Sequence, residues 1–325
     1  METFTYTRAT GVQQAIQAAG QSQTRFIAGG TTLLDLMKLN VERPSQLVDI
    51  NRLPLDQVEK LPDGRLRIGA TVRNSDLAHH PTVVSDYAVL SQALLAGASA
   101  QLRNMATTGG NLLQRTRCMY FRNEAMACNK RTPGSGCSAI EGDNRTLAIL
   151  GTSKDCIATN PSDMNVALTA LEATIHIQGA KGERDVAIGD FFLVPGNTPQ
   201  RETVLEPGEL ITFVTLPAPR TGSKQIYLKL RDRASYEFAL SSAAIVAVVN
   251  GGKLDFVRVA LGGVGTKPWR SFEAERALHG KTADERVFRQ AAEAALHGAQ
   301  PQSENGFKVQ LAKRCITHAL TLATA

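Results

Sequence analysis

The sequence is poor in aromatic residues, and it has no long apolar run. Aromatic residues make up 5% of the 325 positions, with a single tryptophan, which argues against a stacking surface for single-stranded nucleic acid. No apolar stretch approaches the ~20 residues that span a bilayer, so we expect no membrane insertion. The 36 basic residues are scattered, so the net charge of +6 predicts a solvated surface with some anion contacts or a basic docking face for a partner subunit.

The sequence also lacks a signal for export. Residues 1–20 are polar and contain no apolar core of the kind that a secretory signal peptide requires. We therefore expect that the chain does not export itself. It could still leave the cytoplasm as a folded passenger of a partner that carries a signal.

Motifs for independent catalysis are absent as well. The sequence has no G-x-S-x-G and no H-E-x-x-H. The six histidines are dispersed and are expected at surface or packing positions, namely His79, His80, His176, His279, His297 and His318. Because no residue set builds a substrate-activating centre, we predict no catalytic side chain on this chain. An electron relay, in which cofactors carry the chemistry, fits this pattern.

Apolar periodicity predicts short helices alternating with short strands. The first fifty residues read as two β-α-β steps, with helices at 11–19 and 33–37 and strands at 25–28 and 46–50. Further strands are expected at 65–70, 173–178, 204–205, 210–216, 226–230, 243–249 and 254–261, and further helices at 74–79, 87–95 and 163–171. The segment from residue 269 onward is predicted to be helical in about three pieces. Pro217-Ala218-Pro219 is the candidate linker between two domains.

Two glycine-rich turns are candidates for binding phosphate. Ala28-Gly29-Gly30-Thr31 lies between a predicted strand and a predicted helix, where backbone N–H groups and the positive helix end converge. It is neither G-x-G-x-x-G nor a Walker A loop. The second turn is Thr107-Thr108-Gly109-Gly110-Asn111. Together the two turns could hold the two phosphates of one dinucleotide; the alternative is a pair of ordinary tight turns.

Four of the five cysteines fall in a long loop at residues 115–160. They are Cys118, Cys128, Cys137 and Cys156, and they lack the C-x2-C spacing that zinc sites usually show. Four thiolates are the standard ligand set of iron–sulfur clusters, and the basic residues of the loop would stabilise an anionic cluster. We therefore predict an iron–sulfur cluster, with structural zinc or unrelated buried cysteines as the alternatives. Cys315 is expected to be an ordinary core residue.

Four motifs carry a resemblance to a known family. They are FIAGGT at residues 26–31, LRNMATTGGNL at 102–112, PSD at 161–163 and ALGGVGTKPWR at 260–270. Over nearly its whole length the chain resembles the FAD-binding subunits of the xanthine dehydrogenase and aldehyde oxidase superfamily. Within that superfamily it is most similar to the flavin subunits of bacterial three-subunit periplasmic aldehyde oxidoreductases.

The resemblance implies an α+β fold with two domains. Residues 1–218 would form a two-lobed FAD-binding domain of the vanillyl-alcohol-oxidase-like (PCMH) type, with lobes at about 1–53 and 54–218 and the cysteine loop inserted at 115–160. Residues 219–325 would form a small sheet with a helical cluster, as in the C-terminal domain of CO dehydrogenase flavoproteins.

The resemblance also implies which residues bind FAD. The first turn would wrap the pyrophosphate through the backbone of Ile27, Ala28, Gly29, Gly30, Thr31, Thr32, Leu33 and Leu34. The second turn would form the second phosphate and ribityl wall through Thr107, Thr108, Gly109, Gly110 and Asn111. Asp163 would accept hydrogen bonds from FAD, Lys229 would lie near the isoalloxazine, and the backbone of Ile211 would touch the cofactor.

The cysteine loop is implied to be a feature of two branches of this superfamily. In the aldehyde oxidoreductase and 4-hydroxybenzoyl-CoA reductase branches such a loop holds a [4Fe–4S] cluster, so Cys118, Cys128, Cys137 and Cys156 become its expected ligands. The details RTRC at 115–118 and CNKR at 128–131 favour the aldehyde oxidoreductase branch. The cluster would either relay electrons or only hold the loop.

The resemblance further implies partner subunits in a heterotrimer. One partner would carry the molybdenum cofactor and oxidise an aldehyde, and another would carry two [2Fe–2S] clusters that pass electrons to FAD on this chain and on to an external acceptor. The expected location is the periplasm, reached with a signal-bearing partner, or alternatively the cytoplasm. The rival functions are a flavin subunit of another molybdenum hydroxylase or a 4-hydroxybenzoyl-CoA-reductase-like enzyme, a stand-alone FAD oxidase, and a non-enzymatic zinc-stapled module.

Overall fold

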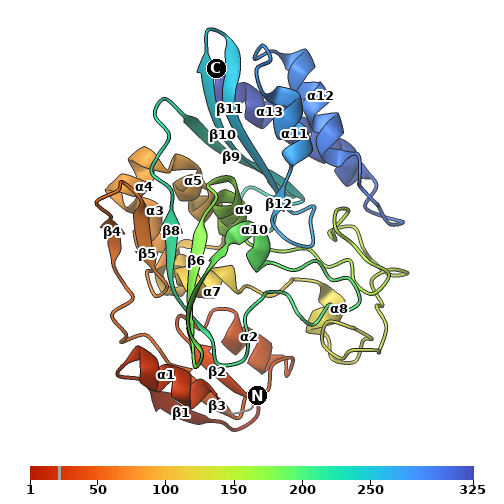
Figure 1. The fold of residues 1–325 in the computed structure, drawn as a ribbon. Coiled ribbons are helices and arrows are strands. Elements are labelled where there is room, and N and C mark those ends of the chain that lie inside the picture. The colour runs from red at the N-terminus through yellow and green to blue at the C-terminus, as the bar shows by residue number, and fades with distance from the viewer. Residues whose placement is uncertain (21–22) are drawn as a thin grey trace.

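The first lobe is a small parallel sheet covered by two helices. The structure is a computed structural model that describes residues 1–20 and 23–325. The lobe contains β1 (Thr5–Arg8), α1 (Val12–Ala19), β2 (Thr24–Ile27), α2 (Leu33–Lys38) and β3 (Gln46–Asp49), and its strand order is β1-β3-β2. Both neighbours pair with β3 in parallel, so the chain forms two β-α-β steps as predicted, although no strand was predicted at β1. Figure 1 shows this lobe at one end of the molecule, in red.

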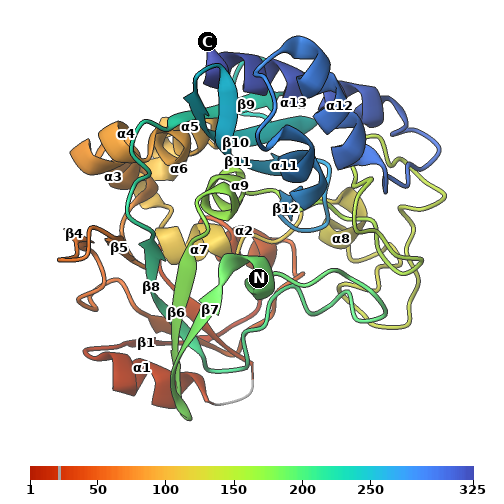
Figure 2. The same cartoon turned by 45° about the horizontal axis from the view of Figure 1, so that its top comes forward.

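The second lobe is an antiparallel sheet flanked by short helices. Its strands follow the order β4-β5-β8-β6-β7 and are β4 (Val58–Lys60), β5 (Leu66–Gly69), β6 (Thr174–Gly179), β7 (Gly182–Ala187) and β8 (Leu210–Leu216). Its helices are α3 (Asn74–His79), α4 (Pro81–Asp86), α5 (Ala88–Ala96), α6 (Ala100–Met105), α7 (Thr108–Leu112), α9 (Asp163–Ala170) and α10 (Ile188–Phe191). Every residue of α9 is buried, and Figure 2 shows this helix near the centre of the molecule.

The C-terminal part is an antiparallel sheet with helices on both of its faces. Its strands, in the order β12-β11-β10-β9, are β9 (Lys224–Leu230), β10 (Ser241–Asn250), β11 (Lys253–Gly262) and β12 (Trp269–Arg270). Three helices follow, namely α11 (Phe272–Leu278), α12 (Glu285–Leu296) and α13 (Phe307–Thr324), so the prediction of three helical pieces is confirmed. No helix within residues 1–20 and 23–325 is both long and apolar enough to cross a membrane.

Strand β10 contributes side chains to two different hydrophobic core clusters. Ala243 and Ile245 pack in one core cluster with α11, α12 and α13, whereas Ala244 and Val246 pack in the other cluster with α5 and α9. Alternate residues of a strand point to opposite faces, so both faces of β10 are buried. Because both faces are buried, the sequence of β10 is an almost continuous apolar run.

The structure differs from one of the predicted strands. The predicted strand at residues 204–205 is wrong: Thr203 forms a single bridge to Phe192, and the segment otherwise runs as an irregular connection to β8. Thr32 is the N-cap residue of α2, but its side chain makes no capping hydrogen bond. A hairpin at Asn250-Gly251-Gly252 joins the predicted strands at 243–249 and 254–261, since both glycines have positive φ and Asn250 pairs with Lys253.

A buried carboxylate ties β1 to β3. Asp49 accepts hydrogen bonds from the Tyr6 hydroxyl, from Arg8 Nε at 3.0 Å and from the Asn51 backbone N–H at 2.9 Å. Burial alone would raise the pKa of Asp49, but the bonds from Tyr6, Asn51 and Arg8 outweigh it and lower the pKa from 3.8 to about 2. A carboxyl with a depressed pKa stabilises the fold above its unfolded pKa and loses that contribution as pH falls through the folded value.

We therefore expect Asp49→Asn to lower the free energy of unfolding by about 2 kcal/mol at pH 7. The difference from the unmodified chain should shrink as pH falls from about 4 to about 2. Urea unfolding at pH 7 and pH 3 measures this, with Asp185→Asn as a control because Asp185 is an exposed carboxylate paired with His176. Equal destabilisation at both pH values would contradict the assignment.

Candidate functional site

A cavity of about 1080 Å³ lies where the two glycine turns meet the cysteine loop. Most of its wall comes from four segments that are far apart in sequence: the β2–α2 turn, the start of α7, the cysteine loop and the connection between α10 and β8. The residues from these segments include Arg25 to Leu33, Thr107, Gly110, Arg115, Lys130, Cys156, Ala158 to Pro161, Glu202 and Leu205 to Glu209. A cavity of this size can accept a large elongated ligand.

The first turn presents unused hydrogen-bond donors to this cavity. Residues 29–33 all line it, and within the described parts of the chain none of their backbone N–H groups has a protein acceptor. Gly30 takes a φ of +71°, which glycine adopts without strain, and α2 begins at Leu33. A row of free N–H groups beside a turn of this kind is an anion-binding arrangement.

Gly29 is required by a close approach between two backbone segments. A Cβ atom at this position would lie 1.9 Å from the carbonyl oxygen of Met105, at the end of α6. The first turn is therefore pressed directly against the segment that leads into the second turn. This contact brings the two glycine turns to the same cavity.

Most backbone donors of the second turn are already hydrogen-bonded within the protein. Thr107 caps α7 by accepting a hydrogen bond from Gly110 N–H at 3.2 Å. The N–H groups of Thr108, Gly109 and Asn111 already donate to Val72, Ala70 and Thr107 respectively. Only Thr107 and Gly110 of this turn line the cavity, because the other three residues are buried behind it.

A second cavity of about 190 Å³ adjoins the first and contains Asp163. Thr159, Asn160 and Pro161 line both cavities, so the two are neighbours. Ser162 caps α9 through Asn165 N–H, and this places Asp163 in the first turn of the helix, where the helix dipole favours a negative charge.

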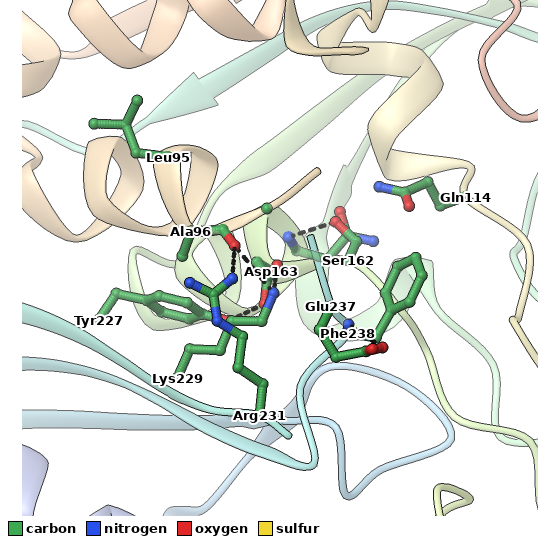
Figure 3. A network of polar contacts seen from close by, with 12 residues as sticks. Leu95, Ala96, Gln114, Ser162, Asp163, Tyr227, Lys229, Arg231, Glu237 and Phe238 are labelled. Carbon is green, nitrogen blue, oxygen red and sulfur yellow. Dashed lines mark hydrogen bonds and ion pairs between the residues drawn. The ribbon is translucent and has the colours of Figure 1, made fainter. Parts of the chain in front are cut away.

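The Asp163 carboxylate is the centre of a buried polar network, shown in Figure 3. Lys229 Nζ lies 2.8 Å from Oδ2, and the Tyr227 hydroxyl donates to Oδ1 at 2.5 Å. The side chains of Asp163 and Lys229 are 8% and 4% exposed, and Lys229 also donates to the Ala96 carbonyl at 3.1 Å. Burial, followed by the Asp163 charge, raises the pKa of Tyr227 well above its usual value.

The structure brings most of the predicted FAD residues to the two cavities. Those lining the first cavity are Ile27, Ala28, Gly29, Gly30, Thr31, Thr32, Leu33, Thr107 and Gly110, and Asp163 lines the second with Lys229 bonded to it. Leu34, Thr108, Gly109, Asn111 and Ile211 line neither cavity. Ile211 lies buried in β8 opposite Ile177. The individual roles of all these residues stay predictions.

Sequence reasoning missed Tyr227, which completes the Asp163 network. It lies two residues before Lys229 on β9, so both side chains point to the same face of the strand. That two-residue spacing was the available signal, but it has meaning only once the partner Asp163 is known to lie beside β9.

The four loop cysteines come together in a third, small pocket. Cys118, Cys128, Cys137 and Cys156 all line it, and only Cys137 is more than slightly exposed. Burial raises the pKa of Cys118 to about 12, although the N–H groups of Phe121 and Tyr120 favour its thiolate. The expectation that Cys315 is a core residue is confirmed, since it is 1% exposed in α13.

Burial and nearby polar groups have opposite effects on the thiol pKa in this pocket. Burial raises the pKa of Cys156, while Lys130 and the Ala158 N–H oppose that shift. Within the described residues, no three or more His, Cys, Asp or Glu side chains are arranged to hold a metal ion. Four thiols around one pocket are a donor set that both an iron–sulfur cluster and structural zinc can use.

The cysteine pocket shares walls with both larger cavities. Lys130, Cys156 and Ala158 line the first cavity as well as the cysteine pocket, and Cys118 lines the second cavity too. Lys130 and the other basic residues near the pocket also have protein partners. Lys130 Nζ lies 2.8 Å from Glu202 Oε1 and donates to the Pro199 carbonyl at 2.9 Å. Arg115 forms ion pairs with Glu42 and Glu202. Arg117 and Arg122 both form ion pairs with Asp35. Arg131 donates hydrogen bonds to backbone carbonyl groups.

This fold and these cavities define a flavin-binding subunit. Residues 2–219 match the family model described as the FAD binding domain in molybdopterin dehydrogenase, and residues 226–323 match the CO dehydrogenase flavoprotein C-terminal domain. The chain belongs to this family of FAD-binding subunits, and it is therefore part of an oxidoreductase of the molybdenum hydroxylase type. The predicted family and the predicted α+β fold are confirmed.

Individual relatives match the chain over almost its full length. It is 51% identical to the aldehyde oxidoreductase FAD-binding subunit PaoB of Escherichia coli (strain K12), with 100% of this chain and 99% of that protein covered. It is 30% identical to the glyceraldehyde dehydrogenase medium chain of Sulfolobus acidocaldarius, with 93% and 90% covered. A solved structure of carbon monoxide dehydrogenase from Hydrogenophaga pseudoflava, 26% identical, superposes with a TM-score of 0.78 over 99% of this chain and 97% of that chain.

Proposed function

We propose that this chain is the FAD- and [4Fe–4S]-containing electron-transfer subunit of a heterotrimeric molybdenum aldehyde oxidoreductase. In this proposal it receives electrons from [2Fe–2S] clusters on one partner and passes them to an external acceptor, while another partner carries the molybdenum cofactor and oxidises the aldehyde. The observation that carries the proposal is the row of free N–H groups at residues 29–33, which faces a cavity large enough for FAD.

The residues present fit FAD as an elongated ligand that extends from the first cavity into the second. The free N–H groups of the first turn would hold the pyrophosphate, because backbone donors at a turn bind phosphate oxygens. Bound FAD supplies the chemistry that joins two-electron and one-electron transfers. Asp163 would orient the flavin ring end from the second cavity, which it lines, and Lys229 and Tyr227 fix its carboxylate from behind.

The aldehyde as substrate class is supported by sequence similarity. The relative named as an aldehyde oxidoreductase subunit is 51% identical over the whole chain, whereas relatives named for carbon monoxide or nicotinate are 25–26% identical. We also propose a periplasmic location, reached together with a signal-bearing partner. The proposed partners follow from the resemblance of the whole chain to flavin subunits of this superfamily.

The [4Fe–4S] cluster is supported by the donor set in the cysteine pocket. Four thiols from one loop surround it, and Lys130 and the N–H groups of Tyr120, Phe121 and Ala158 would stabilise thiolate charge. Thiolates with N–H donors around them are the usual environment of such clusters. The cysteine pocket lies beside both proposed flavin cavities. This position is compatible with a cluster that relays electrons and with a cluster that only holds the loop in place.

The experiment that tests the proposal is a visible absorption spectrum of the purified complex, combined with iron and zinc analysis. Flavin bands and about four iron atoms beyond those of the partners would support FAD and a [4Fe–4S] cluster on this chain. Flavin with zinc and no additional iron would remove the cluster but keep the flavin subunit. Absence of flavin would overturn the assignment of both glycine turns.

We expect Cys128→Ser to remove the iron of this subunit while flavin is retained. Cys128 is suited to this test because it lines the cysteine pocket but neither flavin cavity. Iron analysis measures the loss, and Cys315→Ser, at a buried cysteine in α13, is the matched control that should keep all iron. Full iron content in Cys128→Ser would contradict its role as a ligand, and unchanged flavin reduction with lower stability would indicate a scaffold.

A further inference from the structure

Lys308 is a buried cation in an unfavourable position. It is 0% exposed, and it lies in the first turn of α13, where the positive end of the helix dipole opposes a positive charge. Among the described residues no carboxylate forms an ion pair with it. Burying an unpaired charge is costly, so this lysine must be held by other strong contacts.

Those contacts are three backbone carbonyl groups. Lys308 Nζ donates to the carbonyl oxygens of Thr146 at 3.0 Å, Leu147 at 2.9 Å and Gly263 at 2.5 Å. An ammonium group has three hydrogens, so each one has an acceptor. Thr146, Leu147 and Gly263 all line the second cavity, the one that contains Asp163. One ammonium group therefore joins two walls of that cavity.

The two walls belong to different parts of the chain. Thr146 and Leu147 lie within the cysteine loop, whereas Gly263 follows β11 and has a φ of +71°. A Cβ atom at Gly263 would lie 2.5 Å from the carbonyl oxygen of Ala239, which also lines the second cavity. Gly263 thus packs directly against the β9–β10 loop. Moving Gly263 would move that loop as well.

Two buried asparagines fix the same junction. Asn305 Nδ2 lies 3.3–3.4 Å from the carbonyl oxygens of Asn144, Leu147 and Ala148. Asn144 accepts a hydrogen bond from Glu304 N–H at 3.0 Å, and both asparagines are 0% exposed. The start of α13 is therefore attached to residues 144–148 of the cysteine loop, and Lys308 extends this attachment to Gly263.

The charge on Lys308 responds to the same contacts. Burial lowers the pKa of Lys308 to about 7, and the nearby Arg145 adds to that shift. The three carbonyl groups oppose it, because they are hydrogen-bonded to the ammonium form. In its ammonium form Lys308 places a positive charge directly behind the wall of the second cavity, in a region where electrostatic effects are weakly screened.

We propose that Lys308 is a positioning residue for the flavin ring end: it fixes the two walls of the second cavity and favours the reduced, more negative flavin. This inference rests on the proposed function, in which the ring end lies in that cavity. It assigns to Lys308 a role in setting the flavin midpoint potential. It also explains why a lysine lies fully buried in the first turn of a helix.

The test is Lys308→Met in the complete complex, with Lys313→Met as the matched control. Lys313 lies on the same helix but pairs with Glu293, whose side chain is 67% exposed. We expect Lys308→Met to retain flavin and to lower the reduced-to-oxidised ratio about tenfold at a fixed potential, a negative shift of about 30 mV for a two-electron couple. Hydrogen exchange should increase at residues 144–149 and 262–265 but not in α12. The control should match the unmodified complex in both measurements.

A second variant keeps the test decisive if Lys308→Met does not assemble. Lys308→Gln removes the charge but keeps two N–H donors, so we expect the same direction of potential shift with less change in exchange. An unchanged flavin potential in Lys308→Gln would overturn the inference. If the unmodified complex contains no flavin, the proposed function fails instead, and the exchange data still report whether Lys308 holds the two walls together.

Discussion

Replacing Gly29 with alanine is expected to abolish stable FAD binding. The new Cβ would lie 1.9 Å from the Met105 carbonyl oxygen and 2.7 Å from its carbon. Both atoms belong to the backbone, so no side-chain rotation relieves the overlap, and the β2–α2 turn must move away from α6. That movement displaces the N–H groups of residues 29–33, which all line the first cavity.

We expect Gly29→Ala to weaken FAD binding at least 100-fold, or about 2.7 kcal/mol, and to lower the free energy of unfolding by about 3 kcal/mol. Flavin content after gel filtration and urea unfolding measure the two effects. Gly189→Ala is the matched control, because a Cβ at Gly189 meets no atom within 4 Å and alanine is the better helix former in α10. Normal flavin content in Gly29→Ala would mean that the first turn does not hold the cofactor.

The sequence predicted elements that are encoded locally. The apolar runs of β8, β10 and β11 are bounded by turn residues, and the FIAGG segment combines a buried strand with glycines, so both patterns can be recognised in a short window. The hairpin at Gly251-Gly252 is of the same kind, because its two positive φ angles demand glycine.

The strands that were not predicted from the sequence are held by pairing with other strands of their sheets. β1, with the sequence TYTR, has three exposed residues of four, and it is held by its parallel register with β3 some forty residues away. β7, with the sequence GERDVA, is similarly polar and forms the edge of its sheet. Neither segment has an apolar period of its own, so pairing rather than propensity decides its conformation.

In the candidate site, too, the locally encoded part was predicted and the part that depends on distant contacts was not. The first glycine turn was predicted because its strand, glycines and helix are contiguous. The network of Tyr227, Lys229 and Asp163 joins β9 to α9 across 64–66 residues, and Lys308 joins α13 to carbonyls up to 162 residues away. No local pattern distinguishes these residues from ordinary strand and helix positions. Only the packing of the C-terminal sheet against α9 brings the first network together.

The second large effect is expected at the ion pair of Asp163 and Lys229. Asp163→Asn leaves the Lys229 ammonium buried without a charged partner, and we expect it to lower the free energy of unfolding by about 3 kcal/mol and to abolish flavin binding. Lys229→Met should destabilise the fold less. The remaining carboxylate keeps the hydrogen bond from Tyr227 and the positive end of α9.

The double variant Asp163→Asn with Lys229→Met separates stability from function. Replacing both members of a buried ion pair with neutral residues of similar size removes the stranded charge, so most of the lost stability should return. Flavin binding should not return, since neither side chain can then orient the ring end. Urea unfolding and flavin content measure both outcomes, with Asp63→Asn, at an exposed carboxylate paired with Arg65, as the control. Recovery of flavin in the double variant would show that the pair serves the fold alone, and that Lys229 and Asp163 do not define the ring end of the site.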